Sequence, residues 1–309
     1  MLVWDDLRFF LAIARSGSQS AAARALGADQ TTVGRRLTAL EAHLGARLFT
    51  RSARGLLPTA AAEAIREAAE RAERAMLAVE RASSGLDTRA RGTVRLATTD
   101  ALARGFVLAA MADLRESHPE VKVVLTTAPE TVDLVKGEAD VALRTVRPVD
   151  SDLVVRKVGV VHHGLYAAPS YLARRSRPRE AKGLTGHDVL EMAAGFDSAQ
   201  RRFLTGVSTQ GSRVVFEANN VVSLVRATEL GMGLAVLPTF LVDEASSSAL
   251  VRLWPDRDDA QDLWLAVHAD VRNAARIRAV MESLAARVSP RRGGITEDRK
   301  KVVRKPPRR

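Results

Sequence analysis

The sequence predicts a multidomain α/β protein in which a small helical domain precedes a larger domain of alternating strands and helices. Three features indicate this: two short helices joined at Gly27, a long charged helix over residues 59–86, and strand–helix–strand alternation from residue 93 onward. Such alternation favours a parallel sheet with helices packed on its faces. At 309 residues, the chain can hold two or three domains.

The composition favours a cytoplasmic protein. Hydrophobic residues make up 46% of the chain, and no apolar run is long enough to cross a bilayer. Asp5 and Asp6 stand where a secretory signal would be basic. The absence of cysteine excludes disulfides, thiolate nucleophiles and cysteine metal sites, and it agrees with a reducing compartment. We therefore expect no association with a membrane.

The net charge of +11 is concentrated at the two ends of the chain. Residues 1–60 contain 8 basic and 4 acidic residues, and residues 289–309 contain 9 basic and 2 acidic ones. In residues 61–288 the two signs balance. This distribution suggests a polyanionic partner that meets the ends of the chain. The last segment is rich in Pro, Gly and Arg, and we expect it to be a basic disordered tail.

Residues 18–44 have the pattern of a helix-turn-helix. Ser20 is expected to cap the first helix and Gly27 to close it, and Asp29 is expected to cap a second helix that ends before Gly45. The second helix has one apolar stripe, formed by Val33, Leu37, Leu40 and Leu44. Its polar residues lie in the N-terminal half, which a helix-turn-helix presents to the major groove. On these residues alone, a helical hairpin with a solvated face is the alternative.

The segments on either side support a winged version of this motif. Asp5 or Asp6 is expected to cap a preceding helix that packs behind the helix-turn-helix. Arg51 and Arg54 flank a turn that resembles the wing of a winged helix. Guanidinium groups there would reach phosphates or the minor groove. A solvated hairpin tip is the alternative.

The long helix is expected to begin at a Thr59 cap and to join two copies of the chain. Glu67 and Arg71 have the spacing of a favourable ion pair. An apolar stripe recurs every three or four residues, at Ala61, Ile65, Ala68, Ala72, Met76 and Val79. A short domain offers little to cover such a stripe, so we expect a partner helix from a second chain. A helix folded back onto its own chain is the alternative.

The larger domain is expected to have two lobes. Its expected strands are 93–99, 121–127, 139–143, 153–160, 164–168, 214–217, one within 231–238 after the stop at Gly231, and 263–268. Its expected helices are 101–116, 130–136, 221–230 and 273–288.

No catalytic or metal-binding constellation stands out, so we expect neither an enzyme nor a cofactor. The six histidines have no metal-ligand spacing, and adjacent His162 and His163 would point to opposite faces of a strand. No phosphate-binding glycine loop or nucleophile elbow is present. An enzyme on the same two-lobed scaffold and a sequence-tolerant, nucleoid-type DNA-binding protein are the alternatives.

Over residues 2–288 the chain resembles the LysR-type transcriptional regulators. The motifs that carry this resemblance are Phe9-Phe-Leu-Ala12, Gly17-Ser-Gln-Ser-Ala-Ala22, Leu40-Glu41, Leu44-Gly45, Leu48-Phe49, Gly137-Glu-Ala-Asp140 and Glu229-Leu-Gly-Met-Gly-Leu-Ala-Val-Leu-Pro238. Two departures are Gly34, where the family most often has serine, and Thr31-Thr32, where a proline-containing pair is common. Both suggest a distinct operator preference.

The resemblance implies four parts with different roles. These are a winged helix-turn-helix DNA-binding domain at 1–58, a linker and dimerisation helix at 59–90, a two-lobed α/β periplasmic-binding-protein-like effector domain at 91–288, and the tail at 289–309. Lobe I would comprise about 91–167 and 263–288, and lobe II about 168–262. The implied partners are an operator in double-stranded DNA, a small-molecule effector, RNA polymerase, and further copies of the chain in a homodimer or homotetramer.

The resemblance also assigns the DNA-binding residues. It implies that Gln30, Thr31, Thr32 and Arg35 contact base edges, and that Gly34 lies between them in the DNA-binding surface. It implies that Ser20, Arg36, Arg51 and Arg54 contact the DNA backbone.

Candidate effector contacts follow from the expected sheet, because ligands of open α/β domains bind beyond the carboxyl ends of the strands and at helix N-termini. The residues at such positions are Thr99, Asp100, Ala101, Thr127, Thr145, His162, Asp197, Asn219 and Asn220. Helix capping by Thr127 or Asp100, and an interior role for His162, are the alternatives. A carboxylate at Asp100 would compete with an anion for the helix start, so it favours a neutral or amine-bearing effector.

Overall fold

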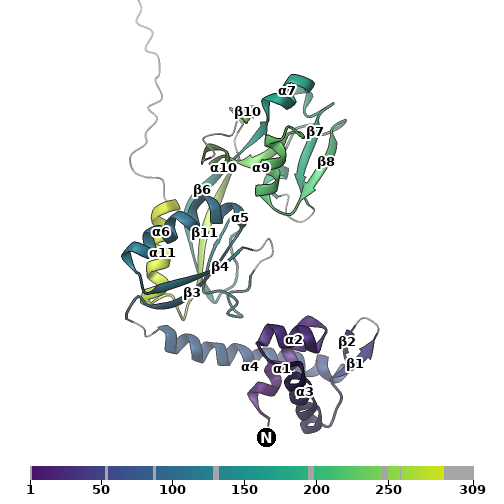
Figure 1. Ribbon diagram of the computed structural model, residues 1–309, viewed down its shortest axis with the longest axis vertical. Coiled ribbons are helices and arrows are strands. Elements are labelled where there is room, and N and C mark those ends of the chain that lie inside the picture. Colours follow the sequence, from purple (N-terminus) through teal and green to yellow (C-terminus); the bar gives the residue numbers. More distant parts are fainter. Residues whose placement is uncertain are drawn as a thin grey trace, which may run out of the picture.

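The computed structural model describes residues 2–52, 55–85, 88–127, 132–193, 198–244, 250–257 and 259–288. A helical domain with a small hairpin, one long helix and a two-lobed α/β domain follow one another along the chain (Figure 1). This is the architecture that the sequence predicts. Arg54, Asp197 and the basic tail at 289–309 lie outside the described residues.

The N-terminal domain packs three helices around one apolar core. Its elements are α1 (Trp4–Ser16), α2 (Gln19–Leu26), α3 (Gln30–Leu44), β1 (Phe49–Ser52) and β2 (Gly55–Pro58). Phe10, Ile13, Val33, Leu40 and Leu48 are completely buried in this core. Helix α1 therefore packs behind the helix-turn-helix, as expected.

The glycines close the helices of this domain, but the N-caps differ from those expected. Gly17, Gly27 and Gly45 have φ angles of 69°, 62° and 65°, which is the left-handed conformation that favours glycine. Helix α2 begins two residues earlier than predicted, at Gln19. Its cap is Ser18, whose hydroxyl accepts a backbone N–H at 3.1 Å, so the prediction that Ser20 caps this helix was wrong.

Two predicted aspartate caps also make no capping hydrogen bond. Helix α1 begins at Trp4 after Val3, which places Asp5 and Asp6 inside the first turn. There they act on the positive end of the helix dipole instead of accepting an orphan N–H. Asp29 occupies the N-cap position of α3 without a side-chain hydrogen bond.

Phe10→Ala is expected to destabilise the N-terminal domain by about 3–5 kcal/mol, because truncating a fully buried aromatic ring leaves a cavity. The Phe10 ring is 0% exposed and its centroid lies 5.7 Å from that of Phe49. Hydrogen exchange of the full chain should show faster exchange across α1–α3. Leu57→Ala is the matched control, because Leu57 is 49% exposed and its loss should leave exchange almost unchanged.

The long helix α4 (Ala60–Gly85) buries only its first half in the N-terminal domain. The Thr59 hydroxyl accepts the backbone N–H of Ala62 at 3.3 Å, which confirms the predicted cap. Ala62 and Ala69 are buried against the core of that domain. Met76 and Val79, farther along, are 42% and 66% exposed. The fully buried positions are thus not those of the predicted stripe. Within that stripe, Ala61 and Ile65 are half-buried against the domain core, whereas Ala68, Met76 and Val79 are exposed.

One mixed sheet forms lobe I and continues into lobe II. The strand order is β10 (Val251–Leu253), β6 (Leu153–Ala167), β11 (Asp259–His268), β5 (Val141–Arg144), β3 (Gly92–Thr98) and β4 (Val121–Thr127), with β9 (Ala235–Pro238) also paired to β6. Of these strands, β9 and β10 belong to lobe II. Strand β3 runs parallel to both β4 and β5. Helices α6 (Leu108–Ser117) and α11 (Ala275–Val288) lie side by side against this sheet (Figure 1).

Strands β6 and β11 connect the two lobes. They pair antiparallel from Leu153 opposite His268 to His163 opposite Asp259. The sequence predicts two separate strands here, but β6 is continuous, because the residues between them also pair with β11 and Val161 is buried. His162 is exposed and His163 is buried, as expected for neighbours on one strand.

The helix predicted at 101–116 is divided into three pieces. A short α5 (Asp100–Leu102) leads into a π-helical segment, Ala103–Val107, and then into α6. A Cβ added at Gly105 would lie 2.4 Å from the ring of Phe240, and the Phe106 and Phe240 rings are 4.7 Å apart. The wide π turn thus lies where the backbone packs closely against a helix of lobe II.

The prediction of a helix at 130–136 was wrong, because the described part of this segment, residues 132–136, contains no helix. Residues 134–137 form a turn that ends at Gly137, whose φ is 69°. The Asp133 carboxylate accepts the backbone N–H groups of Val135 and Lys136 at 2.9 and 3.1 Å. These bonds supply the local alternative to helix that aspartate commonly offers.

Lobe II surrounds a two-stranded parallel sheet. Its elements are α7 (Pro169–Arg175), a 3₁₀ turn (Glu180–Lys182), β7 (Asp188–Met192), α8 (Ser198–Phe203), β8 (Arg213–Ala218), α9 (Val221–Glu229) and α10 (Thr239–Glu244). Tyr171 is completely buried beneath β7, and its hydroxyl accepts the backbone N–H of Asp188 at 2.8 Å. Burial raises the pKa of Tyr171 and lowers that of neighbouring His187. This pair is part of the lobe's interior.

Candidate functional site

Helix α3 presents a free polar face. Gln30, Thr31 and Arg35 are exposed, and Thr32 and Gly34 are half-buried. Its opposite face is anchored, because Val33 and Leu40 are completely buried. The residues predicted to contact bases therefore lie together on the side of α3 that faces away from the domain core.

Arg36 does not share that free face. Its guanidinium lies 3.2 Å from the Asp6 carboxylate and 3.6 Å from that of Asp5, both on α1. Asp6 is only 8% exposed. Arg36 therefore links α3 to α1 through ion pairs, a structural role that the sequence pattern did not indicate.

The hairpin β1–β2 is fixed to the end of α1. The backbone N–H of Leu56 donates to the carbonyl of Gly17 at 2.8 Å. A Cβ at Gly55 would lie 2.6 Å from the same oxygen, so only glycine fits this approach. Arg51 is exposed on β1. Ser20, near the start of α2, is also exposed. Both side chains are thus accessible from outside the domain.

The candidate effector residues of lobe I gather at the ends of its strands. Thr99 caps α5, and its hydroxyl accepts the backbone N–H of Leu102 at 3.4 Å. Asp100 is half-buried in the first turn of α5. Thr127 is exposed at the end of β4, and Thr145 is half-buried just after β5. These four residues therefore lie just at or after the carboxyl ends of β3, β4 and β5, which are neighbours in the sheet.

Ala101 has a packing role in the contact between the lobes. It is 6% exposed and belongs to the same apolar cluster as Leu224 of α9 and Leu237 of β9. Helices α5 and α9 are in contact. Asn220 caps α9 by accepting the backbone N–H of Ser223 at 2.8 Å, and its amide donates to Asn219 at 3.3 Å. The helix starts at Thr99 and Asn220 thus belong to helices that pack against each other.

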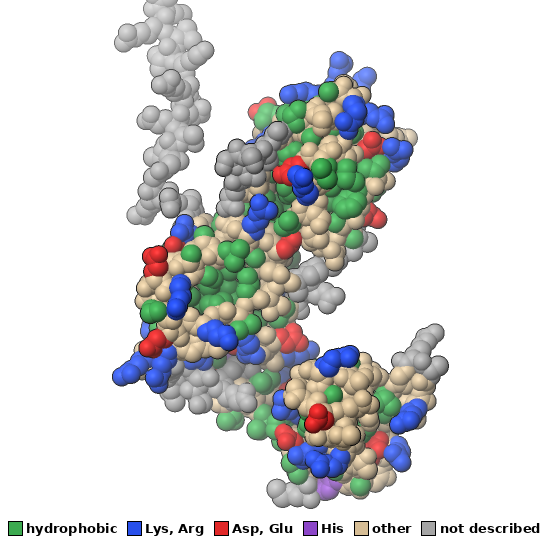
Figure 2. Space-filling model, in the orientation of Figure 1, with side chains coloured by type: hydrophobic (Ala, Val, Ile, Leu, Met, Phe, Trp, Pro, Cys, Tyr) green, Lys and Arg blue, Asp and Glu red, His purple; other side chains and the backbone are tan. Residues whose placement is uncertain are grey.

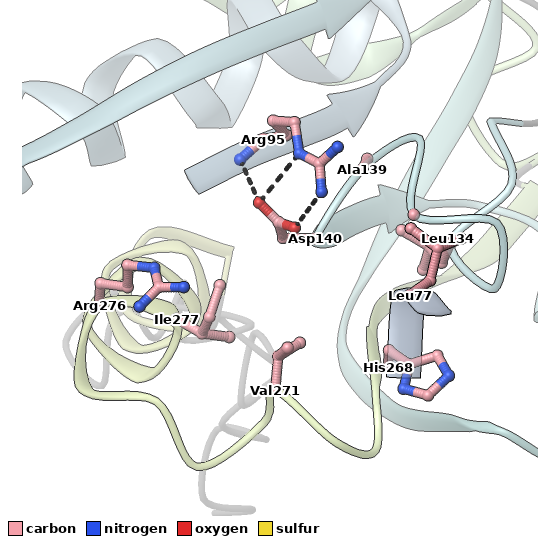
Figure 3. Close-up of a pocket in the computed structure, with 10 residues that line it drawn as sticks. Leu77, Arg95, Leu134, Ala139, Asp140, His268, Val271, Arg276 and Ile277 are labelled. Carbon is pink, nitrogen blue, oxygen red and sulfur yellow. Dashed lines mark hydrogen bonds and ion pairs between the residues drawn. The ribbon is translucent and has the colours of Figure 1, made fainter. Parts of the chain in front are cut away.

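A second junction joins lobe I to the long helix. Leu77 of α4 packs over Gly137, where an added Cβ would lie 3.5 Å from a Leu77 methyl group. A cavity of about 90 Å³ beside this contact is lined by residues of α4, β3, β11 and α11 (Figure 3). Across it, Arg95 binds Asp140 through both its backbone N–H and its guanidinium, each at 2.7 Å.

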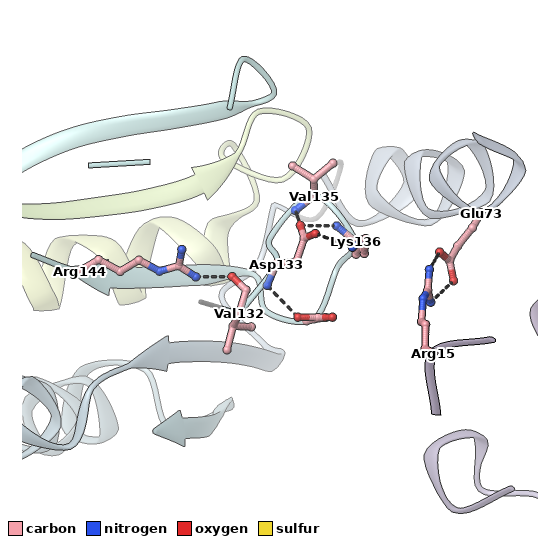
Figure 4. A network of polar contacts seen from close by, with 8 residues as sticks. Arg15, Glu73, Val132, Asp133, Val135, Lys136 and Arg144 are labelled. Atoms are coloured by element: carbon pink, nitrogen blue, oxygen red, sulfur yellow. Dashed lines mark hydrogen bonds and ion pairs between the residues drawn. The ribbon is translucent and has the colours of Figure 1, made fainter. Parts of the chain in front are cut away.

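The same junction reaches the N-terminal domain. Arg15 of α1 makes a bidentate ion pair with Glu73 of α4, at 3.0 and 2.5 Å (Figure 4). The hydrogen bond to Glu73 raises the pKa of Arg15, and the carboxylate of Glu138 in lobe I contributes to this shift. Helix α4 therefore contacts α1 through Glu73 and lobe I through Leu77, one turn farther along.

Other classes of site are absent from the residues that the structure describes. No group of three or more His, Cys, Asp or Glu side chains is arranged to hold a metal ion. None of the described helices combines the length and the apolar character that a membrane crossing requires. Two candidate sites remain. One is the polar face of α3, and the other is the region between the lobes, where the starts of α5 and α9 lie close together.

A winged helix-turn-helix joined by a long helix to a two-lobed α/β domain defines a DNA-binding regulator with a ligand-responsive domain. Family comparison identifies a bacterial regulatory helix-turn-helix domain of the LysR family at residues 4–63 and a LysR substrate-binding domain at 87–289. The chain belongs to the LysR family of transcriptional regulators. It is therefore a regulator and not an enzyme.

Individual relatives agree with this assignment. The chain is 31% identical over 255 residues to an HTH-type transcriptional regulator of Xanthomonas campestris pv. campestris (strain 8004), covering 80% of this chain and 74% of the relative. It is 30% identical over 293 residues to the Mau operon transcriptional activator of Paracoccus denitrificans, covering 90% and 93%. The full-length structure of the Vibrio cholerae virulence activator AphB shares the fold, with 22% identity, a TM-score of 0.63, and coverage of 93% and 100%.

Proposed function

We propose that this protein binds a specific operator in double-stranded DNA as a homodimer or a dimer of dimers, and that a small molecule held between its lobes controls this binding. The winged domain at 1–58 would bind DNA, helix 59–90 would pair the subunits, and the two-lobed domain at 91–288 would sense the effector. The observation that carries the proposal is the exposed polar face in the N-terminal half of α3, because the opposite face anchors this helix in the domain core. Action on DNA implies the cytoplasm, where contact with RNA polymerase completes the proposed role.

The DNA contacts are divided by their geometry. Gln30, Thr31, Thr32 and Arg35 are proposed to read base edges, because they occupy the N-terminal half of the recognition helix. Ser20 and Arg51 are proposed to contact the phosphate backbone together with Arg54. Arg36 would act mainly by holding α3 on α1, because it is already paired with two aspartates.

The proposed effector site lies between the starts of α5 and α9. Thr99, Asp100, Thr127 and Thr145 would line it from lobe I, and His162, Asp197, Asn219 and Asn220 from the crossover strand and lobe II. Ala101 is buried between the lobes and would set their spacing. Because Asp100 places a carboxylate in the first turn of α5, a neutral or amine-bearing effector is favoured over a simple carboxylate.

Subunit pairing would use two surfaces. One is the exposed end of the α4 stripe at Met76 and Val79. The other involves both lobes, on which hydrophobic side chains gather at the surface (Figure 2). The exposed ones include Leu108 and Val124 of lobe I and Val214 and Val215 of lobe II. Exposed apolar surface of this kind is typical of interaction sites.

The experiment that tests the proposal is selection from a pool of random duplexes with the full-length protein at fixed salt. A sequence-specific regulator should enrich one motif and bind it about 10³-fold or more tightly than random DNA. A steep salt dependence with almost no sequence ratio would instead show a nucleoid-type protein dominated by phosphate contacts.

Deleting residues 289–309 is expected to lower affinity for all DNA about equally. The segment carries 9 basic and 2 acidic residues, and phosphate attraction does not depend on sequence. Fluorescence anisotropy on the selected operator and on random duplex, each over a range of salt concentrations, measures this. Weakening of the operator complex alone would contradict it and would indicate that the tail reads sequence or shape.

The junction at Leu77 is proposed to transmit the effector signal. Strand β5 runs from this junction, at Gly137–Asp140, to Thr145 at the proposed effector site. A shift between the lobes would therefore reach α4 and, through Arg15 and Glu73, the DNA-binding domain.

Leu77→Asp is expected to release lobe I from α4, at a cost of roughly 2–3 kcal/mol for the junction, because it removes apolar contact and buries a charge. Small-angle X-ray scattering of the full chain should show a larger radius of gyration. Ala64→Asp, on an exposed position of the same helix, is the matched control and should leave it unchanged. If the two variants gave the same scattering curve, the Leu77 contact would not hold lobe I on α4, and it could not transmit the effector signal.

A further inference from the structure

The recognition helix has a gap in the middle of its exposed face. Gln30 and Thr31 lie one turn before Gly34 and Arg35, and Thr38 follows a turn later on the same side. Gly34 contributes no side chain at the centre of this face. A base edge opposite Gly34 would therefore meet no functional group from α3 itself.

A side chain from the neighbouring helix covers this gap. Gln19 is the first residue of α2. A Cβ built on Gly34 would lie 3.6 Å from Oε1 of Gln19, 3.8 Å from Nε2 and 3.9 Å from the carbon between them. The whole carboxamide of Gln19 thus rests on the backbone of Gly34, in the space where another residue would place its side chain.

The Gln19 carboxamide lies at a defined place, but its hydrogen-bonding groups have no partner among the described residues. Among the described residues it makes no hydrogen bond, although the neighbouring Ser18 hydroxyl accepts the N–H that caps α2. Gln19 is half-buried, and its carboxamide atoms are not among the fully buried polar atoms that lack a hydrogen-bond partner. A fixed amide with a free donor and a free acceptor is the group that pairs with N6 and N7 of adenine in the major groove.

We propose that Gln19 is a specificity-determining residue that reads a base edge, preferentially adenine, through the gap left by Gly34. The inference rests on the proposed function, in that α3 must enter the major groove. Gly34 and Gln19 then act as one unit: the glycine provides the space, and the glutamine supplies the hydrogen-bonding group from α2.

Selection from randomised duplexes with the full-length protein and its variants tests this pairing. Gln19→Met keeps the size of the side chain and its packing on Gly34 but removes the amide. It should lose the preference at one A·T pair in each half-site and bind the wild-type motif about 5- to 100-fold more weakly, with unchanged affinity for random duplex. Gly34→Ser should alter the preference at the same base pair, because its hydroxyl enters the space of the carboxamide. Gln210→Met, an exposed position in lobe II, is the matched control.

The outcomes separate the inference from the function on which it rests. An unchanged motif and affinity for Gln19→Met would overturn the role of Gln19 while the regulator interpretation stands. Equal weakening on every duplex would also overturn it, because that result indicates a phosphate contact. A wild-type protein that enriched no motif would overturn the proposed function itself, and the wild-type arm alone reveals that outcome. Circular dichroism of each variant confirms folding.

Discussion

Replacing Met76 and Val79 together by aspartate is expected to convert the proposed homodimer into single chains of 33.4 kDa and to weaken operator binding at least a hundredfold. Both side chains are exposed near the end of α4, beyond the part that its own domain covers. Two carboxylates buried in a paired-helix interface would each cost several kcal/mol. A single chain would also lose the second half-site, which a dimer binds without a further association cost.

Light scattering measures the mass, and anisotropy on the selected operator measures the affinity. Val149→Asp is the matched control, because Val149 is 97% exposed in a loop of lobe I. It introduces an exposed aspartate without touching α4 and should leave both quantities unchanged. A double variant that kept the dimer mass would show that α4 does not hold the subunits together.

Arg35→Ala is expected to remove roughly 1–3 kcal/mol of operator binding and to relax base preference at one position, as for the loss of a bidentate contact to guanine. Arg35 is exposed on α3 and forms no ion pair with any other described residue, so its guanidinium is available. Arg8→Ala is the control, because Arg8 is also exposed and removes the same charge from the domain. It should weaken operator and random DNA by the same small factor.

Arg36→Ala should behave differently from its neighbour. Its removal leaves the nearly buried Asp6 without its ion-pair partner, so the folded domain should lose stability instead of base preference. Hydrogen exchange across α1 and α3 distinguishes the two effects. If Arg35→Ala left both affinity and preference intact, the base-reading role of Arg35 would be excluded.

The sequence determined the elements whose signals are local. The apolar spacing of Val33, Leu37 and Leu40, between Asp29 and Gly45, was sufficient to predict α3. Thr59 was sufficient to place the start of α4. Strand β5 and helix α9 were found for the same reason, since periodicity and capping act within a few residues of the chain. These elements, in this order, already indicated the family.

Only the tertiary structure decided which partner each side chain meets. In the folded chain, Arg36 forms an ion pair with α1, and the Gln19 carboxamide lies over Gly34. Leu77 packs on Gly137, and β6 continues from one lobe into the other. In each case the partner is distant in sequence or lies on another element, and a one-dimensional pattern contains no information about that contact. Local sequence determines where a helix or strand forms, whereas packing determines which of its polar groups remain free to act.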